Sequence, residues 1–178
     1  MNLYLIRHTN VDVEPGNCCG QSDVGVAPTF QVEKDNLAEK LKAVEFDKIY
    51  SSPLFRCKIL AKALFNEADI ILDGRLKELN FGDWELKTWN DIYNSEEGKI
   101  WMDNYQTLST LNGESYPEMV KRVSEFYADL IEEEHENVAV FTHAGVIRIF
   151  KSIINKTIID VLFETFKPEY GSITEFKL

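Results

Sequence analysis

Two short runs of the chain are apolar on both faces, Leu3–Ile6 and Val138–Phe141. Such runs are typical of parallel strands buried between layers of helices, because neither face of the strand meets water. Phe46–Tyr50 and Ile70–Leu72 predict two further strands, and Ser172–Phe176 predicts a weaker last one. We therefore expect a central, mostly parallel sheet.

Amphipathic helices are predicted between these strands. After Pro53, apolar residues recur at helical spacing, with Ser52 as the expected N-cap and Pro53 at the first helical position. Ser115 and Glu118 form a capping-box pattern that predicts the start of a second long helix. The expected inner face of that helix comprises Met119, Val120, Val123, Phe126, Tyr127, Leu130 and Ile131. The alternation predicts a three-layer α/β/α sandwich.

Residues 79–112 break this alternation. They are rich in Trp, Asn, Tyr and Asp and have only weak periodicity. We expect them to form a small helical cap insertion over one end of the sheet, within one domain that spans residues 1–178. Its tryptophans, Trp84, Trp89 and Trp101, could line a substrate cavity or pack the insertion, and the pattern favours neither.

The net charge of −11 argues against a nucleic-acid or membrane-surface partner, since both require a basic patch. No run of 18 apolar residues is present, and the apolar N-terminal run is too short for a signal peptide. The three cysteines, including the adjacent Cys18 and Cys19, suit no disulfide framework and have no metal-ligand spacing. We expect a cytoplasmic protein without a bound metal. The pattern does not predict its oligomeric state.

Rare side chains follow the ends of predicted strands. Arg7 and His8 come directly after the first buried run, and His143 comes directly after Val138–Phe141 and Thr142. Ligands of open parallel sheets bind at the carboxyl ends of the strands, so His8 and His143 should converge if these strands are neighbours. Arg56 falls in the first turn of a helix that also follows a strand. The sequence therefore predicts a positively charged island in an acidic protein.

These residue types suit phosphoryl transfer. Guanidinium groups bind phosphate through paired hydrogen bonds, and a neutral imidazole can attack phosphorus in line. Neighbouring cations keep an imidazole neutral by disfavouring its protonation. The second histidine can donate to an equatorial oxygen. Glu78 is the candidate acid for the leaving alkoxide, since it follows a strand and its apolar neighbours would raise its pKa.

Five segments resemble, in order, the motifs of the histidine phosphatase superfamily, which has a phosphoglycerate mutase-like fold. They are similar to its Arg-His-Gly signature, second arginine motif, acid-bearing segment, Gly-Glu-Ser turn and second histidine motif. The segments are Leu5–Thr9, Ser51–Cys57, Leu76–Glu85, Asn112–Ser115 and Val140–Gly145. The resemblance covers nearly the whole chain. Each motif is weak alone, but five in family order are specific.

The resemblance implies that His8 carries the phosphoryl group and that Glu78 donates the proton. The residues implied to bind phosphate are Arg7, Arg56 and His143. No metal or other cofactor is expected. Thr9 and Ala144 replace glycines that are common in the family. Together with residues 16–23, Thr9 is most similar to the branch that contains the α-ribazole-5′-phosphate phosphatases of cobalamin biosynthesis.

Three functions remain open at this point. The first is hydrolysis of a small phosphate monoester, such as α-ribazole 5′-phosphate. The second is a phosphoglycerate mutase-type transfer, which requires a lid that keeps water from the intermediate; the short segment 79–112 favours hydrolysis instead. The third is a non-catalytic binding protein on the same fold, which the presence of both histidines, both arginines and a candidate acid argues against.

Overall fold

The computed structural model describes all residues from 1 to 178 and contains a five-stranded sheet in the order β3-β2-β4-β1-β5. Its strands are β1 (Asn2–Arg7), β2 (Lys48–Ser51), β3 (Ile70–Leu72), β4 (Asn137–Thr142) and β5 (Ile173–Lys177). Neighbouring strands run parallel except β5, which pairs antiparallel with β1. The predicted mostly parallel sheet is confirmed, and all five strands lie where the pattern placed them, to within two residues at either end.

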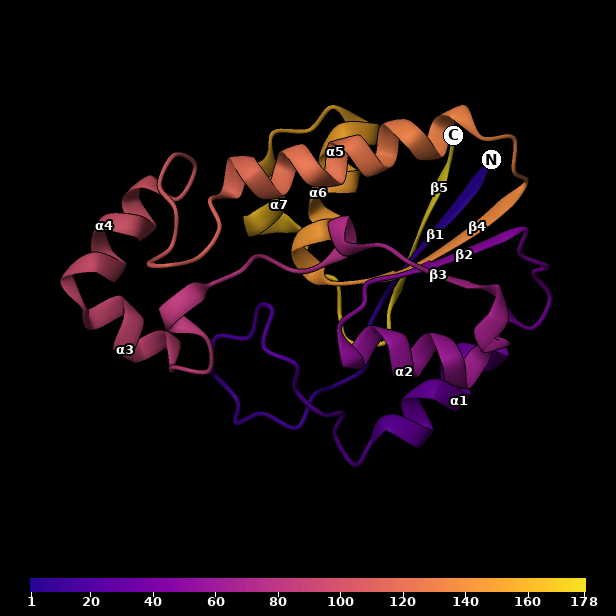
Figure 1. The fold of residues 1–178 in the computed structure, drawn as a ribbon, viewed down its shortest axis with the longest axis horizontal. Helices are drawn as coiled ribbons and strands as arrows, with labels where there is room; N and C mark the ends of the chain where they lie inside the picture. The colour runs from indigo at the N-terminus through magenta and orange to yellow at the C-terminus, as the bar shows by residue number, and fades with distance from the viewer.

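Helices cover both faces of this sheet (Figure 1). α5 (Tyr116–Glu132), α6 (Ala144–Asn155) and α7 (Ile159–Thr165) lie on one face. α1 (Phe30–Leu41) and α2 (Phe55–Leu64) lie on the other. The predicted three-layer α/β/α sandwich is therefore confirmed. None of the helices combines the length and the apolar character that a membrane crossing requires.

Alternate residues of the central strands supply two separate cores. Leu3 and Leu5 of β1 pack with α5 and α6, whereas Ile6 of the same strand packs with α1 and α2. In β4, Val138 and Val140 belong to the first core, and Ala139 and Phe141 to the second. Burial on both faces explains why these strands are apolar at every position. It also fixes their register, which places the residues that follow them.

Of the two N-caps predicted from the sequence, one is present in the structure and one is not. Ser115 caps α5, and its capping box with Glu118 is complete, as predicted. The prediction that Ser52 caps α2 was wrong, because the helix begins two residues later than expected, after Leu54. The carboxylate of Asp23, from a distant loop, accepts a hydrogen bond of 2.6 Å from the first helical N–H, that of Phe55. The predicted inner face of α5 is buried at Met119, Val123, Phe126 and Leu130 and partly buried at Val120 and Tyr127, whereas Ile131 is half exposed.

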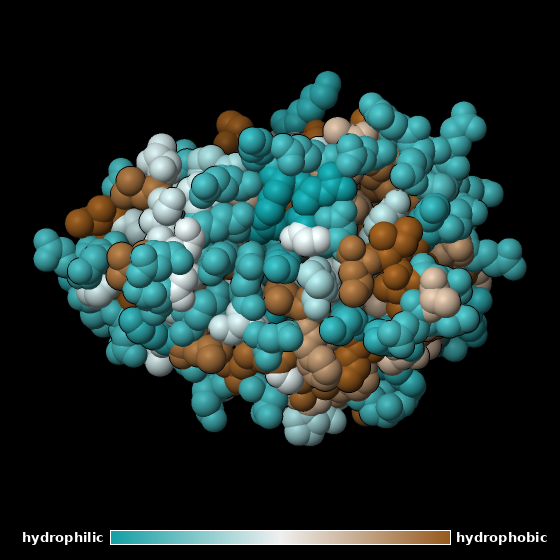
Figure 2. Space-filling model, viewed as in Figure 1, coloured by the Kyte–Doolittle hydropathy of each residue, from teal (hydrophilic) through white to brown (hydrophobic).

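Residues 79–112 contain α3 (Trp89–Asn94) and α4 (Glu96–Asn104), which lie together beyond one end of the sheet (Figure 1). Aromatic rings pack this segment internally, with centroid separations of 5.4 Å for Trp84–Trp101 and 5.3 Å for Phe81–Trp89. The face shown in Figure 2 is largely hydrophilic, as the excess of acidic residues requires.

Candidate active site

The sheet register brings the two motif histidines together. Arg7 pairs with Thr142 across the parallel strands β1 and β4, so the next residues, His8 and His143, leave the sheet side by side. The backbone N–H of His8 continues the ladder with a 3.1 Å hydrogen bond to the Thr142 carbonyl. The imidazole centroids are 5.1 Å apart, and both rings are buried. The two imidazoles therefore lie close enough to act on one small ligand.

Arg56, in the first turn of α2, forms hydrogen bonds with both histidines. Its Nε donates to Nε2 of His8 at 3.2 Å, and its Nη2 lies 3.1 Å from Nδ1 of His143. The rest of the guanidinium donates to the carbonyls of Gly20 and Ser22 at 2.5 and 3.0 Å. Only 1% of Arg56 is exposed. The side chain is thus held in a single orientation by neutral partners.

These contacts define the protonation of both imidazoles. Nδ1 of His8 donates to the Thr9 carbonyl at 2.8 Å, which leaves Nε2 as an unprotonated acceptor. Nδ1 of His143 accepts from Arg56, so its Nε2 donates to the Ser52 hydroxyl at 2.9 Å. Burial, and then the neighbouring guanidinium groups, hold the pKa of both histidines well below the usual value. Both rings are therefore neutral at pH 7.

The positive charge of this site has no carboxylate partner. Neither Arg7 nor Arg56 forms a salt bridge, although the chain contains 30 acidic residues. The buried Nε of Arg7 has no hydrogen-bond partner at all. Buried charges and donors are normally paired, so these groups are arranged to receive an anion. The charged island predicted from the sequence is present.

Tyr170 is a neighbour of this site that the sequence did not suggest. The guanidinium of Arg7 stacks on its ring at 3.7 Å, and the same ring lies 5.5 Å from that of His8. The Pro168 carbonyl accepts from Nη1 of Arg7 at 2.7 Å. The segment before β5 therefore holds Arg7 from two sides. Nothing in its local sequence indicates this, since it is an irregular loop between α7 and β5.

Glu78 lies beside the histidine motif. Its Oε2 accepts a hydrogen bond of 3.0 Å from the N–H of Gly145 in the first turn of α6, and its Oε1 accepts one of 3.1 Å from Leu79. A methyl group on Gly145 would come within 2.2 Å of the carboxylate. Gly145 is therefore needed for the close approach of Glu78 to the start of α6.

Arg122 of α5 positions the segment that carries Glu78. Its guanidinium donates to the backbone carbonyls of Arg75, Lys77 and Glu78 at 2.6–3.0 Å. It also forms an ion pair of 2.6 Å with Glu114, in the Gly-Glu-Ser turn. The ion pair is therefore only part of the role of Arg122. Three carbonyls of an irregular segment depend on one side chain.

Glu85 organises the loop that holds Arg56. Burial favours its neutral form, but backbone N–H groups of Gly20, Gln21, Ser22 and Phe81 donate to its carboxylate at 2.7–3.1 Å and lower its pKa. The ionised carboxylate thereby orients the loop whose carbonyls grip Arg56.

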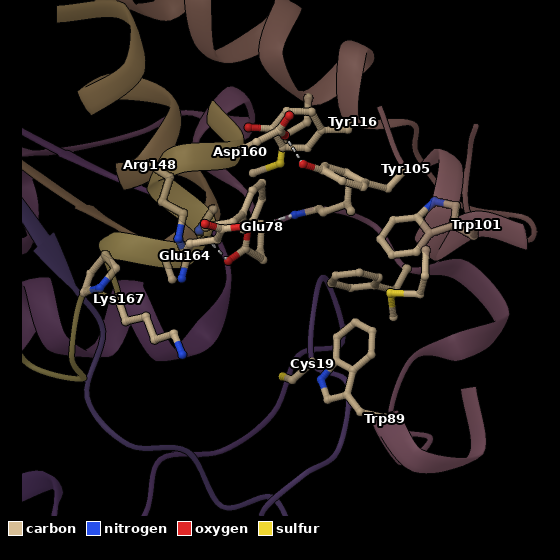
Figure 3. Close-up of a pocket in the computed structure, with 18 of the residues that line it drawn as sticks. Cys19, Glu78, Trp89, Trp101, Tyr105, Tyr116, Arg148, Asp160, Glu164 and Lys167 are labelled. Carbon is tan, nitrogen blue, oxygen red and sulfur yellow. Dashed lines mark hydrogen bonds between the residues drawn. The ribbon is translucent and has the colours of Figure 1, made fainter. Parts of the chain in front are cut away.

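A cavity of about 1000 Å³ opens above the site. Arg7, Glu78 and Tyr170 line it, and the buried ring of His8 lies 5.5 Å from that of Tyr170. Figure 3 shows Trp89 and Trp101 of α3 and α4 on the side opposite Glu78. Segment 79–112 therefore supplies one wall of the cavity.

The cysteines and tryptophans considered in the sequence analysis differ in whether they line the cavity or pack in the core. Cys19 lines the cavity, whereas Cys18 and Trp84 are buried in the core. Trp89 lines the cavity, and Trp101 both lines the cavity and packs in the core against Trp84, so both uses considered for the tryptophans occur. No group of three histidine, cysteine or acidic side chains is arranged to hold a metal ion.

Comparison with known proteins agrees with this architecture. Phosphoserine phosphatase 1 of Hydrogenobacter thermophilus is 25% identical over 155 residues, which cover 83% of this chain and 73% of that protein. A 2,3-bisphosphoglycerate-dependent phosphoglycerate mutase of Cytophaga hutchinsonii is 26% identical over 165 residues, covering 86% and 77%. The crystal structure of the α-ribazole phosphatase of Shigella flexneri superposes with a TM-score of 0.90 at 24% identity, covering 100% and 91%.

These relatives are enzymes of phosphate ester chemistry, both phosphatases and mutases. The family model that describes the histidine phosphatase superfamily, branch 1, matches residues 3–178. The match includes the strand that precedes His8, the segment of Glu78 and the loop of Tyr170. The chain belongs to the histidine phosphatase superfamily (branch 1).

Proposed function

We propose that this protein is a phosphatase that hydrolyses a phosphate monoester through a phosphohistidine on His8, without a metal. The observation that carries the proposal is the unpaired charge at the site. The buried guanidinium groups of Arg7 and Arg56 lack carboxylate partners and lie beside a neutral imidazole whose Nε2 is unprotonated. A dianionic phosphoryl group is a ligand that this arrangement would stabilise.

In the first step, Nε2 of His8 would attack phosphorus in line, and the bond between phosphorus and the alcohol oxygen would break. The electron pair of that bond stays on the oxygen, which takes a proton from the protonated carboxyl of Glu78. Arg7 and Arg56 would neutralise the charge on the equatorial oxygens, and the neutral ring of His143 would donate a hydrogen bond to one of them. The products of this step are the free alcohol and phospho-His8.

In the second step, water would attack the phosphorus of phospho-His8 while Glu78, now ionised, takes a proton from it. The phosphorus–nitrogen bond breaks, its electron pair returns to Nε2, and orthophosphate leaves. Glu78 is again protonated at the end of the cycle. Its position beside the start of α6, next to the histidine motif, supports both roles.

For the substrate, we propose a monoester with a ring-bearing alcohol, with α-ribazole 5′-phosphate as the leading candidate. The cavity is lined by several aromatic side chains and is far larger than a phosphate group alone requires. Thr9 and residues 16–23 resemble the branch of α-ribazole-5′-phosphate phosphatases. A role in cobalamin biosynthesis and a cytoplasmic location would follow from this assignment.

Arg148 and Lys167 favour a second candidate, a small acidic monoester such as phosphoserine or 3-phosphoglycerate. Both cations line the cavity and could bind a carboxylate (Figure 3). A mutase reaction on such a substrate would require the phosphohistidine to be shielded from water. The mouth of the cavity includes the exposed side chains of Tyr93 and Lys167, which favours hydrolysis. A non-catalytic binding role would leave the paired imidazoles and Glu78 without a purpose.

A panel of phosphate monoesters tests the proposal. The purified protein is incubated, with a chelator present, with α-ribazole 5′-phosphate, phosphoserine, 3-phosphoglycerate and an aryl phosphate, and orthophosphate is measured. We expect release from the aryl ester and the fastest release from α-ribazole 5′-phosphate. His8→Ala should abolish both. Strict metal dependence, or normal turnover by His8→Ala, would contradict the mechanism.

A further inference from the structure

The cavity has a second end that the proposed chemistry does not use. It is formed by Tyr105, which follows α4, Tyr116 at the first position of α5, and Phe163 of α7, and we refer to these three residues as the aromatic end. Their ring centroids are 5.6–5.9 Å apart and their planes are steeply inclined to one another. Edge-to-face packing of this kind makes a rigid apolar wall.

The two tyrosine hydroxyls of the aromatic end differ in one respect. The hydroxyl of Tyr105 donates to the carboxylate of Asp160 (Figure 3). The same carboxylate also accepts from the Gln106 amide. The hydroxyl of Tyr116 is buried and has no partner, although only 6% of this residue is exposed. Buried hydroxyl groups are nearly always hydrogen-bonded, and one left unpaired is unfavourable.

The surroundings of Tyr116 define what would pair with it. Burial raises the pKa of its phenol, so the hydroxyl keeps its proton and is available as a donor. The carboxylate of Asp160 accepts from Tyr105 and Gln106 and forms no hydrogen bond with Tyr116. The Tyr116 side chain lines the cavity. A molecule bound in the cavity would lie beside Tyr116 and is a source for the missing acceptor.

We propose that the aromatic end is the subsite for the alcohol part of the substrate, a planar ring with a hydrogen-bond acceptor to which the Tyr116 hydroxyl donates. This inference rests on the proposed function, because it assumes that the phosphate of the same molecule lies over His8. Ring packing against Tyr105 and Phe163 would hold the plane of the ring, and Tyr116 would select its orientation. Tyr116 is thus a specificity residue that takes no part in the bond-breaking steps.

The test compares Tyr116→Phe with the wild-type protein on two esters. For α-ribazole 5′-phosphate we expect KM to rise about 5- to 10-fold, the worth of one hydrogen bond, with kcat nearly unchanged. For glycerol 2-phosphate, which has no ring, kcat/KM should not change. Tyr127→Phe is the matched control, since Tyr127 lies in the same helix, packs against Phe150 and does not line the cavity.

Equilibrium binding separates this inference from the proposed function. The Kd of α-ribazole, which lacks the phosphate, is measured by calorimetry. This Kd should be about 5- to 10-fold higher for Tyr116→Phe than for the wild type. The expected difference does not depend on whether the wild type hydrolyses any ester. The melting temperature of Tyr116→Phe should equal or exceed that of the wild type, because the lost hydroxyl has no internal partner. An unchanged Kd, equal losses on both esters, or a lowered melting temperature would overturn the inference.

Discussion

The Nε atom of Arg56 donates to Nε2 of His8 across 3.2 Å, so a buried cation faces the unprotonated nitrogen of the imidazole. The contact keeps the imidazole neutral, because a second positive charge beside the guanidinium would be repelled. When Nε2 bonds to phosphorus, Arg56 loses this acceptor and an oxygen of the phosphoryl group would take its place. The Arg56–His8 contact thus keeps the proposed nucleophile neutral and lies where an oxygen of the phosphoryl group would bind.

Replacing Arg56 by lysine tests this arrangement. An ammonium group keeps the charge but not the planar set of donors that reaches His8, His143 and the loop carbonyls. We expect kcat/KM for an aryl phosphate to fall roughly 100- to 1000-fold. Arg75→Lys is the control, because Arg75 pairs with Asp73 outside the cavity. Similar activity of the two variants would remove Arg56 from the mechanism.

The buried histidines predict a pH-dependent stability. The folded-state pKa values of His8 and His143 lie well below the ordinary value of about 6.5, so below that pH the unfolded chain binds more protons. The free energy of unfolding should be fully retained above pH ~6.5. It should fall as the pH drops below that, by up to ~1.4 kcal/mol per pH unit for each histidine.

Urea unfolding between about pH 5 and pH 7.5 measures this slope in a range where most carboxylates remain ionised. His143→Gln should reduce the slope by about half, since only one of the two histidines remains. A free energy of unfolding that stays constant over this range would show that the two imidazoles titrate alike in the folded and unfolded chains.

Glu78→Gln tests the proton donor. The amide keeps the shape of the side chain but cannot give its proton to an alkoxide. Alkyl phosphates, which have poor leaving groups, should lose roughly 100- to 10,000-fold in kcat, and nitrophenyl phosphate should lose much less. Steady-state rates over a series of esters give the dependence on leaving-group pKa. Equal losses across the series would exclude Glu78 as the acid.

Gly145→Ala should displace the Glu78 carboxylate without changing Glu78 itself. The added methyl group would lie 2.2 Å from Oε1 of Glu78 and would force it away from its position. We expect at least a ~10-fold loss in kcat on alkyl phosphates, with a smaller loss on aryl esters. Gly74→Ala is a control of the same chemistry, since a methyl group there meets nothing within 4 Å. Normal kinetics of Gly145→Ala would mean that Glu78 tolerates displacement.

Arg122→Gln should destabilise the chain more than Glu114→Gln. Both variants break the same ion pair, but the loss of Arg122 also leaves the carbonyls of Arg75, Lys77 and Glu78 without their donor. We expect a loss of about 3–5 kcal/mol in the free energy of unfolding for Arg122→Gln, because the network is largely buried. Urea unfolding of both variants measures this difference. Equal costs would assign the effect to the ion pair alone.

The elements that carry the site were predictable from the sequence because they depend on patterns within a few residues. β1 and β4 are apolar on both faces because helices cover both, and that pattern placed His8 and His143 after the ends of two strands. That these strands are neighbours was left open by the sequence and is shown by the structure. The start of α5 was also predictable, since Ser115 and Glu118 cap it from within four residues.

Features that depend on contacts between distant parts of the chain were not predictable. Ser52 fits a capping pattern, but α2 begins later because Asp23, from a distant loop, binds the N–H of Phe55. Arg122 resembles a surface arginine of an amphipathic helix, and its partners are carbonyls of a segment far away in sequence. Tyr170 lies in an irregular loop whose approach to Arg7 is decided by the pairing of β5 with β1.

The absence of a carboxylate partner for Arg56 has a consequence for the lifetime of the protein. A buried cation without a counter-charge raises the free energy of the folded protein when no ligand is bound. An anion that binds only the folded chain lowers the free energy of the folded state by mass action. Resistance to heat and to proteolysis should therefore increase with the concentration of orthophosphate. In a cell, the phosphate supply would then influence how long each copy of the protein persists.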